Sequence, residues 1–410
     1  MRLFAKKNIV LAAMAVCSAG ASMAQTANTS KVQLWGIVDV AVRHTNNEGA
    51  AKGSKTQMMG GGMSQSRWGI KVEEDLGGGS KALVELENRF DADAGNAAVN
   101  APFFQLANVG LQGAYGRLTA GRQWNVLFDV VTSTYASFPY SPYMEAYKPE
   151  LGMAVGARNS NSLKYMFATP DRSFVGGLQY SFDENNDTRA IEAGFPGNAA
   201  SLPALVGAQA LSTINGGAWK TLGGYLRYST GGLAVGGGFL RTELPGGTDV
   251  DAWTVGGSYR TGPWYFMTGY AQNKAKFATP GSALDPVNIR NAVDKAILGA
   301  FWAGQTNGGF QPGDANKRQL VKLGVGYQLT SQLNLGMHYY RGKQSGSASG
   351  LSNGNSDFLV AVADYAFSKR TDAYFGVDHT KISGGSAVVL DAASGARKRT
   401  GITVGLRHRF

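Results

Sequence analysis

Apolar and polar residues alternate with a period of two in segments spread over most of the chain. In the first segment Val32, Leu34 and Val38 share one face, whereas Asp39 and Arg43 share the other. A strand that is apolar on one face and polar on the other is typical of a tilted membrane strand between lipid and water, about 10 residues long. The pattern therefore predicts an all-β protein.

Sixteen such segments follow one another along the chain. They lie near 32–43, 67–73, 82–89, 105–112, 117–123, 162–168, 173–182, 219–229, 233–242, 250–260, 264–273, 318–327, 333–341, 356–367, 372–380 and 399–410. A single-chain bacterial membrane barrel needs an even number of antiparallel strands. The segments predict a transmembrane antiparallel β-barrel of 16 strands.

The connections between these segments differ in length in a regular way. Those after the even-numbered strands are short: 75–79, 113–116, 169–172, 230–232, 261–263, 329–332 and 368–371. Most of the others are long, including 124–161, 183–218, 274–317 and 342–355, and the connection at 243–249 is intermediate. Membrane barrels have short periplasmic turns and long external loops, whereas a soluble sandwich or propeller has no reason to separate them.

One segment is apolar on both faces. Phe358 and Val360 share a face with Asp364, while Leu359 and Ala361 share the other face. We assign the face that carries Asp364 to the lumen of the barrel.

The first residues have the layout of a secretory signal peptide. Three positive charges precede an apolar run over 9–16, and small residues end at Ala24. The run is shorter than the about 20 residues that a membrane-spanning helix needs. We expect residues 1–24 to be the signal peptide, with a cut after Ala21 as the alternative, and 25–410 to be the barrel.

Composition and charge narrow the class of protein further. Removal of residues 1–24 takes away three positive charges, so the formal net charge falls from +11 to +8, and it takes away Cys17, the only cysteine. The mature chain then has no disulfide, and its stability depends on strand pairing and burial. Its longest basic run is Arg397–Arg399, and this dispersal of charge argues against nucleic acid as a partner.

Enzymatic chemistry finds little support in the sequence. The four histidines, His44, His338, His379 and His408, belong to distant segments, and there is no phosphate-binding loop or His-Glu-x-x-His motif. One Gly-x-Ser-x-Gly motif at 350–354 lies in a Gly/Ser-rich loop without a strand-turn-helix context. We expect no enzyme activity, no cofactor and no metal site.

Several stretches together resemble the general porins of β-proteobacteria, the family that contains the Neisseria and Burkholderia trimeric porins. The stretches that carry the resemblance are Val32–Asp39, Ser66–Ile70, Glu74–Gly79, Gly116–Gln123, Asn161–Tyr165, Ser368–Tyr374 and Gly401–Phe410. They run in order over nearly the whole mature chain.

The resemblance implies an outer-membrane homotrimer that lets small hydrophilic solutes and ions diffuse passively. It also implies that the third external loop, 124–161, folds inward and narrows the pore. Phe410 is similar to the family's recognition signal for the barrel-assembly machinery. Outer-membrane lipid is then a further partner.

We predict the pore constriction at this third loop. Its acids Asp129, Glu145 and Glu150 are expected to face a basic barrel wall. The residues expected in that wall are Arg67, Lys71, Arg89 and Lys164, which alternate inward, and Arg122 and Arg158 at the roots of the loop. An excess of Arg and Lys at the narrowest point favours anions.

Two other functions remain open from the sequence. The first is a substrate-specific channel of the same fold, for phosphate, carboxylates or sugars. The second is a soluble periplasmic β-rich binding protein or enzyme, which would not appear in outer-membrane pellets.

Overall fold

The computed structural model describes the greater part of the chain. The described residues are 30–97, 103–137, 156–182, 219–244, 246–277, 279, 291–292, 294–295, 298, 315–390 and 395–410. The predicted signal peptide, residues 1–24, lies outside them, as do Glu145 and Glu150.

The described part of the chain is almost entirely β-structure. Its elements are β1 (Lys31–Glu48), β2 (Gly53–Gly60), β3 (Arg67–Gly77), β4 (Ser80–Asp91), β5 (Asn96–Ala97), β6 (Leu106–Gly113), β7 (Gly116–Trp124), α2 (Val126–Thr134), β8 (Arg158–Ala168), β9 (Phe174–Ser181), β10 (Thr221–Thr230), β11 (Leu233–Glu243), β12 (Asp249–Thr261), β13 (Trp264–Lys276), β14 (Lys317–Gln328), β15 (Leu333–Ser345), β16 (Gly354–Ala366), β17 (Thr371–Gly384) and β18 (Lys398–Arg409). Within the described residues, no helix is long and apolar enough to cross a membrane.

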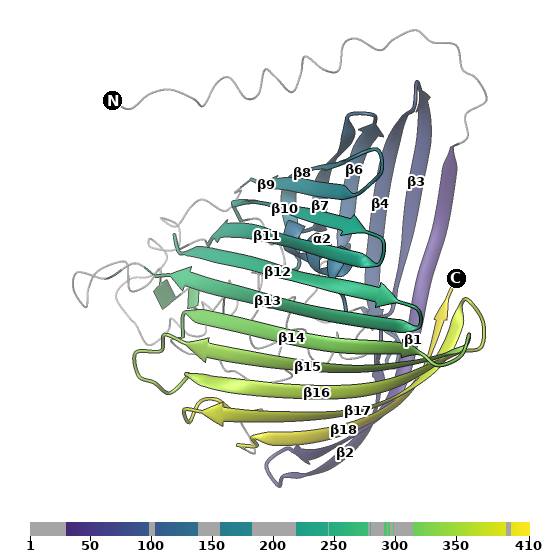
Figure 1. The fold of residues 1–410 in the computed structure, drawn as a ribbon. Coiled ribbons are helices and arrows are strands. Elements are labelled where there is room, and N and C mark those ends of the chain that lie inside the picture. Colours follow the sequence, from purple (N-terminus) through teal and green to yellow (C-terminus); the bar gives the residue numbers. More distant parts are fainter. Residues whose placement is uncertain are drawn as a thin grey trace.

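Sixteen of these strands, all except β2 and β5, form a closed antiparallel barrel in which each strand pairs with the next along the chain (Figure 1). The barrel closes because β1 pairs with β18 as well as with β3. The C-terminal half of β1 pairs with β2 instead of β3, so β2 and β3 together continue one side of the wall. The predicted barrel of 16 strands is confirmed.

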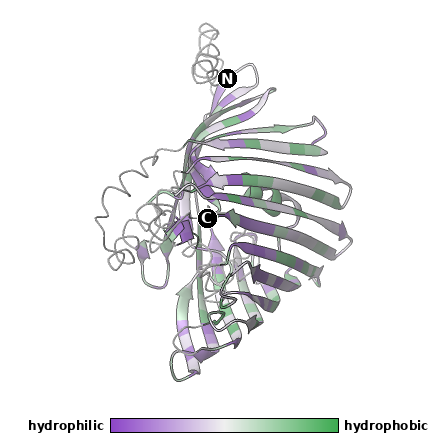
Figure 2. Cartoon of the chain, turned by 90° about the vertical axis from the view of Figure 1, so that its left-hand side faces the viewer, coloured by the Kyte–Doolittle hydropathy of each residue, from purple (hydrophilic) through white to green (hydrophobic). Residues whose placement is uncertain are grey.

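The two faces of the wall follow the predicted alternation. On β1, Val32 and Leu34 are 70% and 63% exposed on the outer surface, whereas Asp39 and Arg43 point inward and are 0% and 4% exposed. Figure 2 shows hydrophobic and hydrophilic residues interleaved along the strands. On β16, Asp364 is buried on the inner side, which confirms the assignment of that face to the lumen.

The ends of the barrel differ as predicted. Short turns join β3 to β4, β6 to β7, β8 to β9, β10 to β11, β12 to β13, β14 to β15 and β16 to β17. The connections from β7 to β8, from β9 to β10 and from β13 to β14 are all long. By the usual asymmetry of membrane barrels, the end with the short turns is periplasmic and the end with the long loops is extracellular.

The seam between β1 and β18 extends to the last residue of the sequence. The backbone N–H of Phe410 donates to the carbonyl oxygen of Gly36 at 3.0 Å, and the N–H of Gly36 donates back to Phe410 at 3.1 Å. A Cβ atom at Gly36 would come within 2.2 Å of the Phe410 ring. Glycine at this position therefore lets the ring pack closely against β1.

Buried ion pairs cross the inner side of the same seam. Arg43 of β1 makes two hydrogen bonds to the carboxylate of Asp378 on β17, at 2.7 and 3.0 Å. Arg407 of β18 pairs with Asp372 at 2.9 Å and donates to the Ser64 hydroxyl at 2.7 Å. These contacts join β1, β17, β18 and the segment between β2 and β3.

We expect Arg43→Met to lower the free energy of unfolding by about 3 kcal/mol, because it leaves the Asp378 carboxylate buried without its partner. The double variant Arg43→Met/Asp378→Leu should regain most of this loss, since neither charge of this pair is then left buried without its partner. Urea unfolding in detergent micelles, followed by tryptophan fluorescence, measures both.

The matched control is Lys81→Met, which breaks the exposed Lys81–Glu73 pair and should cost less than about 1 kcal/mol. Equal losses in Arg43→Met and Lys81→Met would show that the Arg43–Asp378 pair does not hold the seam.

Candidate pore constriction

The third external loop, which we call L3 (residues 125–157), begins with a short helix inside the barrel. Asn125 caps α2 by accepting a hydrogen bond from the N–H of Phe128 at 2.9 Å. The Asn125 side-chain amide also donates to the carbonyl oxygen of Gly156 at 2.8 Å. One residue thus starts the helix and ties the entry of L3 to its exit. The alternation of apolar and polar residues does not predict this helix.

The helix packs against the inner wall of β9 to β12, as Figure 1 shows. Val126, Leu127 and Val130 are buried against Tyr225 and Leu240 of the wall. The N–H of Val126 donates to the Gln179 side chain at 3.0 Å, which fixes the start of the helix.

Glycines in the wall make room for L3. A Cβ atom at Gly238 would lie 3.2 Å from Leu127, and one at Gly236 would lie 3.1 Å from Val130. Further along, a Cβ atom at Gly269 would lie 2.7 Å from the ring of Tyr135. L3 can therefore lie against the backbone of the strands.

The described residues after the helix continue along the inner wall. The Tyr135 hydroxyl hydrogen-bonds to Thr254, and the ammonium of Lys322 lies 4.6 Å from the centre of the Tyr135 ring. The hydroxyl of Ser137 hydrogen-bonds to Tyr340 on β15. L3 is thus attached to the wall from β9 to β15.

Asp129, the one predicted loop acid among the described residues, pairs with a predicted wall residue. Lys164 donates to the Asp129 carboxylate at 2.6 Å and to the carbonyl oxygen of Trp124 at 2.9 Å. Burial raises the pKa of the Asp129 carboxyl, and the ammonium of Lys164 opposes that rise. This pair ties L3 to β8 and neutralises both charges locally.

Three of the predicted arginines meet at one carboxylate. Glu87 of β4, 2% exposed, lies 3.1 Å from Arg89, 3.3 Å from Arg158 and 3.5 Å from Arg67. Glu87 is two positions before Arg89 and so shares its face, but the alternation alone does not predict that Glu87 joins the site.

Arg122 completes this group from β7. It donates to the Ser160 hydroxyl at 2.8 Å, and it lies close enough to Arg89 for their charges to repel. We call Arg67, Arg89, Arg122, Arg158 and Glu87 the arginine cluster. Four guanidinium groups and one carboxylate give it a formal charge of +3.

An aromatic side chain at the root of L3 supports the cluster. The Arg158 guanidinium lies 3.5 Å from the centre of the Trp124 ring, and Arg89 lies 5.6 Å from it. The other partner of Trp124 is Phe128 on α2, stacked at 3.6 Å with planes 7° apart. Cation–π attraction here stabilises positive charge without adding a negative one.

Lys71 lies apart from the cluster. It lies four positions beyond Arg67 on β3, toward the short turn that joins β3 to β4. Its ammonium is 3.2 Å from the Glu85 carboxylate and 5.2 Å from the centre of the Trp35 ring. The structure thus gathers the four predicted arginines, places Lys164 at Asp129, and gives Lys71 a separate acidic partner. Among the described residues, no three His, Cys, Asp or Glu side chains lie together as metal ligands.

Comparison with known proteins gives a consistent set of relatives. A family model described as Gram-negative porin matches residues 10–385. An outer membrane porin protein of Bordetella pertussis is 32% identical over 201 residues, 44% of this chain and 49% of that relative. Outer membrane porin protein 32 of Delftia acidovorans is 31% identical over 266 residues, 63% of this chain and 66% of that relative. The matched part of the chain thus spans about half to just under two thirds of these relatives.

The fold is shared with solved outer-membrane structures, two of which illustrate the likeness. The anion-selective porin from Comamonas acidovorans has a TM-score of 0.64 and 24% sequence identity, with 93% of this chain and 100% of that chain covered. Salmonella typhi OmpF, solved as a complex with daunomycin, has a TM-score of 0.60 and 17% identity, with 93% and 98% covered.

We expect Gly269→Ala to lower the free energy of unfolding by about 1 to 3 kcal/mol, because the added methyl group collides with the Tyr135 ring that attaches L3. Urea unfolding in micelles measures the loss. Gly237→Ala on β11 is the control, since that methyl group would point toward lipid and away from L3. A larger loss in Gly237→Ala than in Gly269→Ala would contradict the proposed role of the glycine.

Proposed function

The chain belongs to the Gram-negative porin family, and we propose that it forms a water-filled channel through which small hydrophilic solutes and ions, anions favoured, diffuse across the outer membrane. A barrel of 16 strands is too wide for its own side chains to fill, so an aqueous lumen remains. Transport by diffusion needs no catalytic group and no cofactor.

The arginine cluster is the observation that carries the anion preference. Charges more than about 8 to 10 Å from a solute are largely screened at physiological salt, so the groups nearest the narrowest point decide selectivity. L3 reduces the width of the lumen, and the cluster lies at the root of L3 beside Trp124. The described acid of L3, Asp129, is already paired with Lys164 and does not offset the cluster.

We propose that the chain works as a homotrimer. Among the structures that share this fold, OmpT of Vibrio cholerae has been solved in a trimer form. The outward faces of the strands are apolar along most of the wall, which suits both lipid and a neighbouring barrel.

We expect the wild-type channel to prefer chloride to potassium, and Glu87→Gln to raise that preference about twofold to fivefold. The reason is that Glu87 carries the one negative charge of the cluster. Arg158→Gln should lower the preference by a similar factor. Reversal potentials in planar bilayers under a potassium chloride gradient give the permeability ratio.

Glu73→Gln is the matched control, because Glu73 is exposed near the short turn of β3 and pairs with Lys81. It should leave the ratio unchanged. Cation preference in the wild type, or equal effects of Glu87→Gln and Glu73→Gln, would refute the assignment of selectivity to the cluster. Block of the current by one particular solute would indicate a substrate-specific channel.

We also propose that the barrel-assembly machinery recognises Phe410. Phe410→Ala should lower the amount of folded, heat-modifiable protein in outer membranes severalfold, while refolding of the purified chain into detergent is reduced much less. Phe367→Ala, an exposed aromatic away from the seam, is the control. Equal losses in cells and in detergent would assign Phe410 to seam stability alone.

A further inference from the structure

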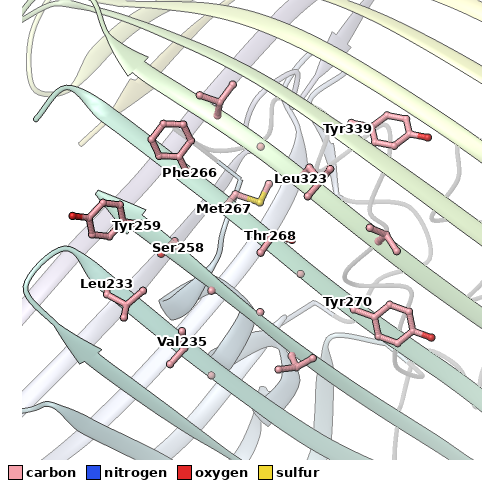
Figure 3. Close-up of a pocket in the computed structure, with 18 of the residues that line it drawn as sticks. Leu233, Val235, Ser258, Tyr259, Phe266, Met267, Thr268, Tyr270, Leu323 and Tyr339 are labelled. Atoms are coloured by element: carbon pink, nitrogen blue, oxygen red, sulfur yellow. The ribbon is translucent and has the colours of Figure 1, made fainter. Parts of the chain in front are cut away.

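The outer surface of the barrel has a groove on the strands from β11 to β16. Its volume is about 1160 Å³, and almost all of its lining is apolar. The groove exists because small residues, Gly257 and Thr268, occupy outward positions between larger side chains such as Val235 and Leu323 (Figure 3). We call it the lateral groove.

Aromatic residues mark both ends of the lateral groove. Tyr259 and Phe266 lie at the end near the short turns, and Tyr270 and Tyr339 lie at the end toward the long loops (Figure 3). Tyrosines on a membrane barrel are enriched at the boundary between hydrocarbon and headgroups. Phe266 and Tyr270 are four positions apart, about 13 Å along the strand, so the groove occupies part of the hydrocarbon region and its Tyr270 end is directed toward the extracellular headgroups.

Three lysines lie just beyond that extracellular end. Lys274 is four positions beyond Tyr270 on β13, Lys317 is four before Val321 of the groove on β14, and Lys343 is four beyond Tyr339 on β15. Residues four apart in a strand share a face, so all three follow the groove on the outer surface.

Two of these lysines face each other directly. Lys274 and Lys317 are partners in the register of β13 and β14, and like charges at such positions repel. On its other side Lys274 faces Asp251 of β12 in the register, but this carboxylate already binds Arg241 at 2.6 Å and Lys276 at 2.5 Å. Within the described part of the chain, neither Lys274 nor Lys317 has an ion-pair partner. An anion from outside the chain would relieve this repulsion.

We propose that the lateral groove and the lysine pair form a binding site for an anionic lipid of the outer leaflet. Its acyl chains lie in the lateral groove, and a headgroup phosphate lies between Lys274 and Lys317. The membrane supplies such a lipid at the depth that the groove and the lysines define. A free anion would match the lysines but would leave the apolar groove unexplained, whereas a phosphorylated lipid accounts for both.

Titration of the delipidated protein in detergent, followed by native mass spectrometry, tests the site. The probe is bis-phosphorylated lipid A, compared with the same lipid after removal of its phosphates. We expect saturable binding of the phosphorylated probe, and an affinity about tenfold lower for Lys274→Gln/Lys317→Gln. Thr268→Trp, which fills the groove and keeps every charge, should lower the affinity similarly.

The control is Lys381→Gln/Lys398→Gln. These lysines face each other across β17 and β18 in the same way, but outside the lateral groove, and their removal should leave the affinity unchanged. Equal losses in the two double variants, or none in Lys274→Gln/Lys317→Gln, would overturn the proposal. So would dissociation of an oligomer by Thr268→Trp, since the groove would then be a contact between copies. Channel conductance is a separate measurement, so failure of lipid binding leaves the proposed transport function unaffected.

Discussion

The structure depends on one constraint, that no backbone group on the lipid side can lack a hydrogen-bond partner. Each unpaired N–H or C=O in hydrocarbon costs several kcal/mol, so the wall must close on itself. Both edges of β1 are paired, one with β18 and the other with β2 and β3. The pairing with β18 extends to the hydrogen bonds between Phe410 and Gly36. Once the backbone is satisfied, the outer face needs only apolar side chains, and the inner face is free to carry charge.

A closed wall of this width creates the second problem, an interior that its own side chains do not fill. L3 fills part of it, and it can do so because glycines in β11 and β13 leave the wall thin where α2 and Tyr135 pack. A glycine within a strand costs roughly 0.5 to 1 kcal/mol relative to alanine. Burial of Leu127, Val130 and Tyr135 offsets that cost. The glycines of β11 and β13 thus stabilise the packing of L3 against the wall, at some cost to the stability of the strands.

The strands could be predicted from sequence because alternation is a local property, and so could the inward direction of Arg67 and Arg89. The helix α2 could not, since Val-Leu-Phe-Asp-Val-Val-Thr is rich in residues that favour strands, and its helical form rests on the Asn125 cap and on packing against the wall. Glu87 was also missed. Alternation gives its face, but only the register of β3 and β4 and the return of the chain at Arg158 bring three arginines to it.

Selectivity in such a lumen follows from incomplete neutralisation and not from the number of arginines. On the seam side, Arg43 and Arg407 each meet a carboxylate, so their charges hold strands together and contribute little net field. In the arginine cluster three guanidinium groups share Glu87 while Arg122 donates to Ser160, and part of the remaining stabilisation comes from the uncharged face of Trp124. An aromatic ring lowers the energy of a cation without cancelling its charge. Positive charge can therefore persist at the root of L3, whereas the pairs of Arg43 and Arg407 cancel their charges at the seam.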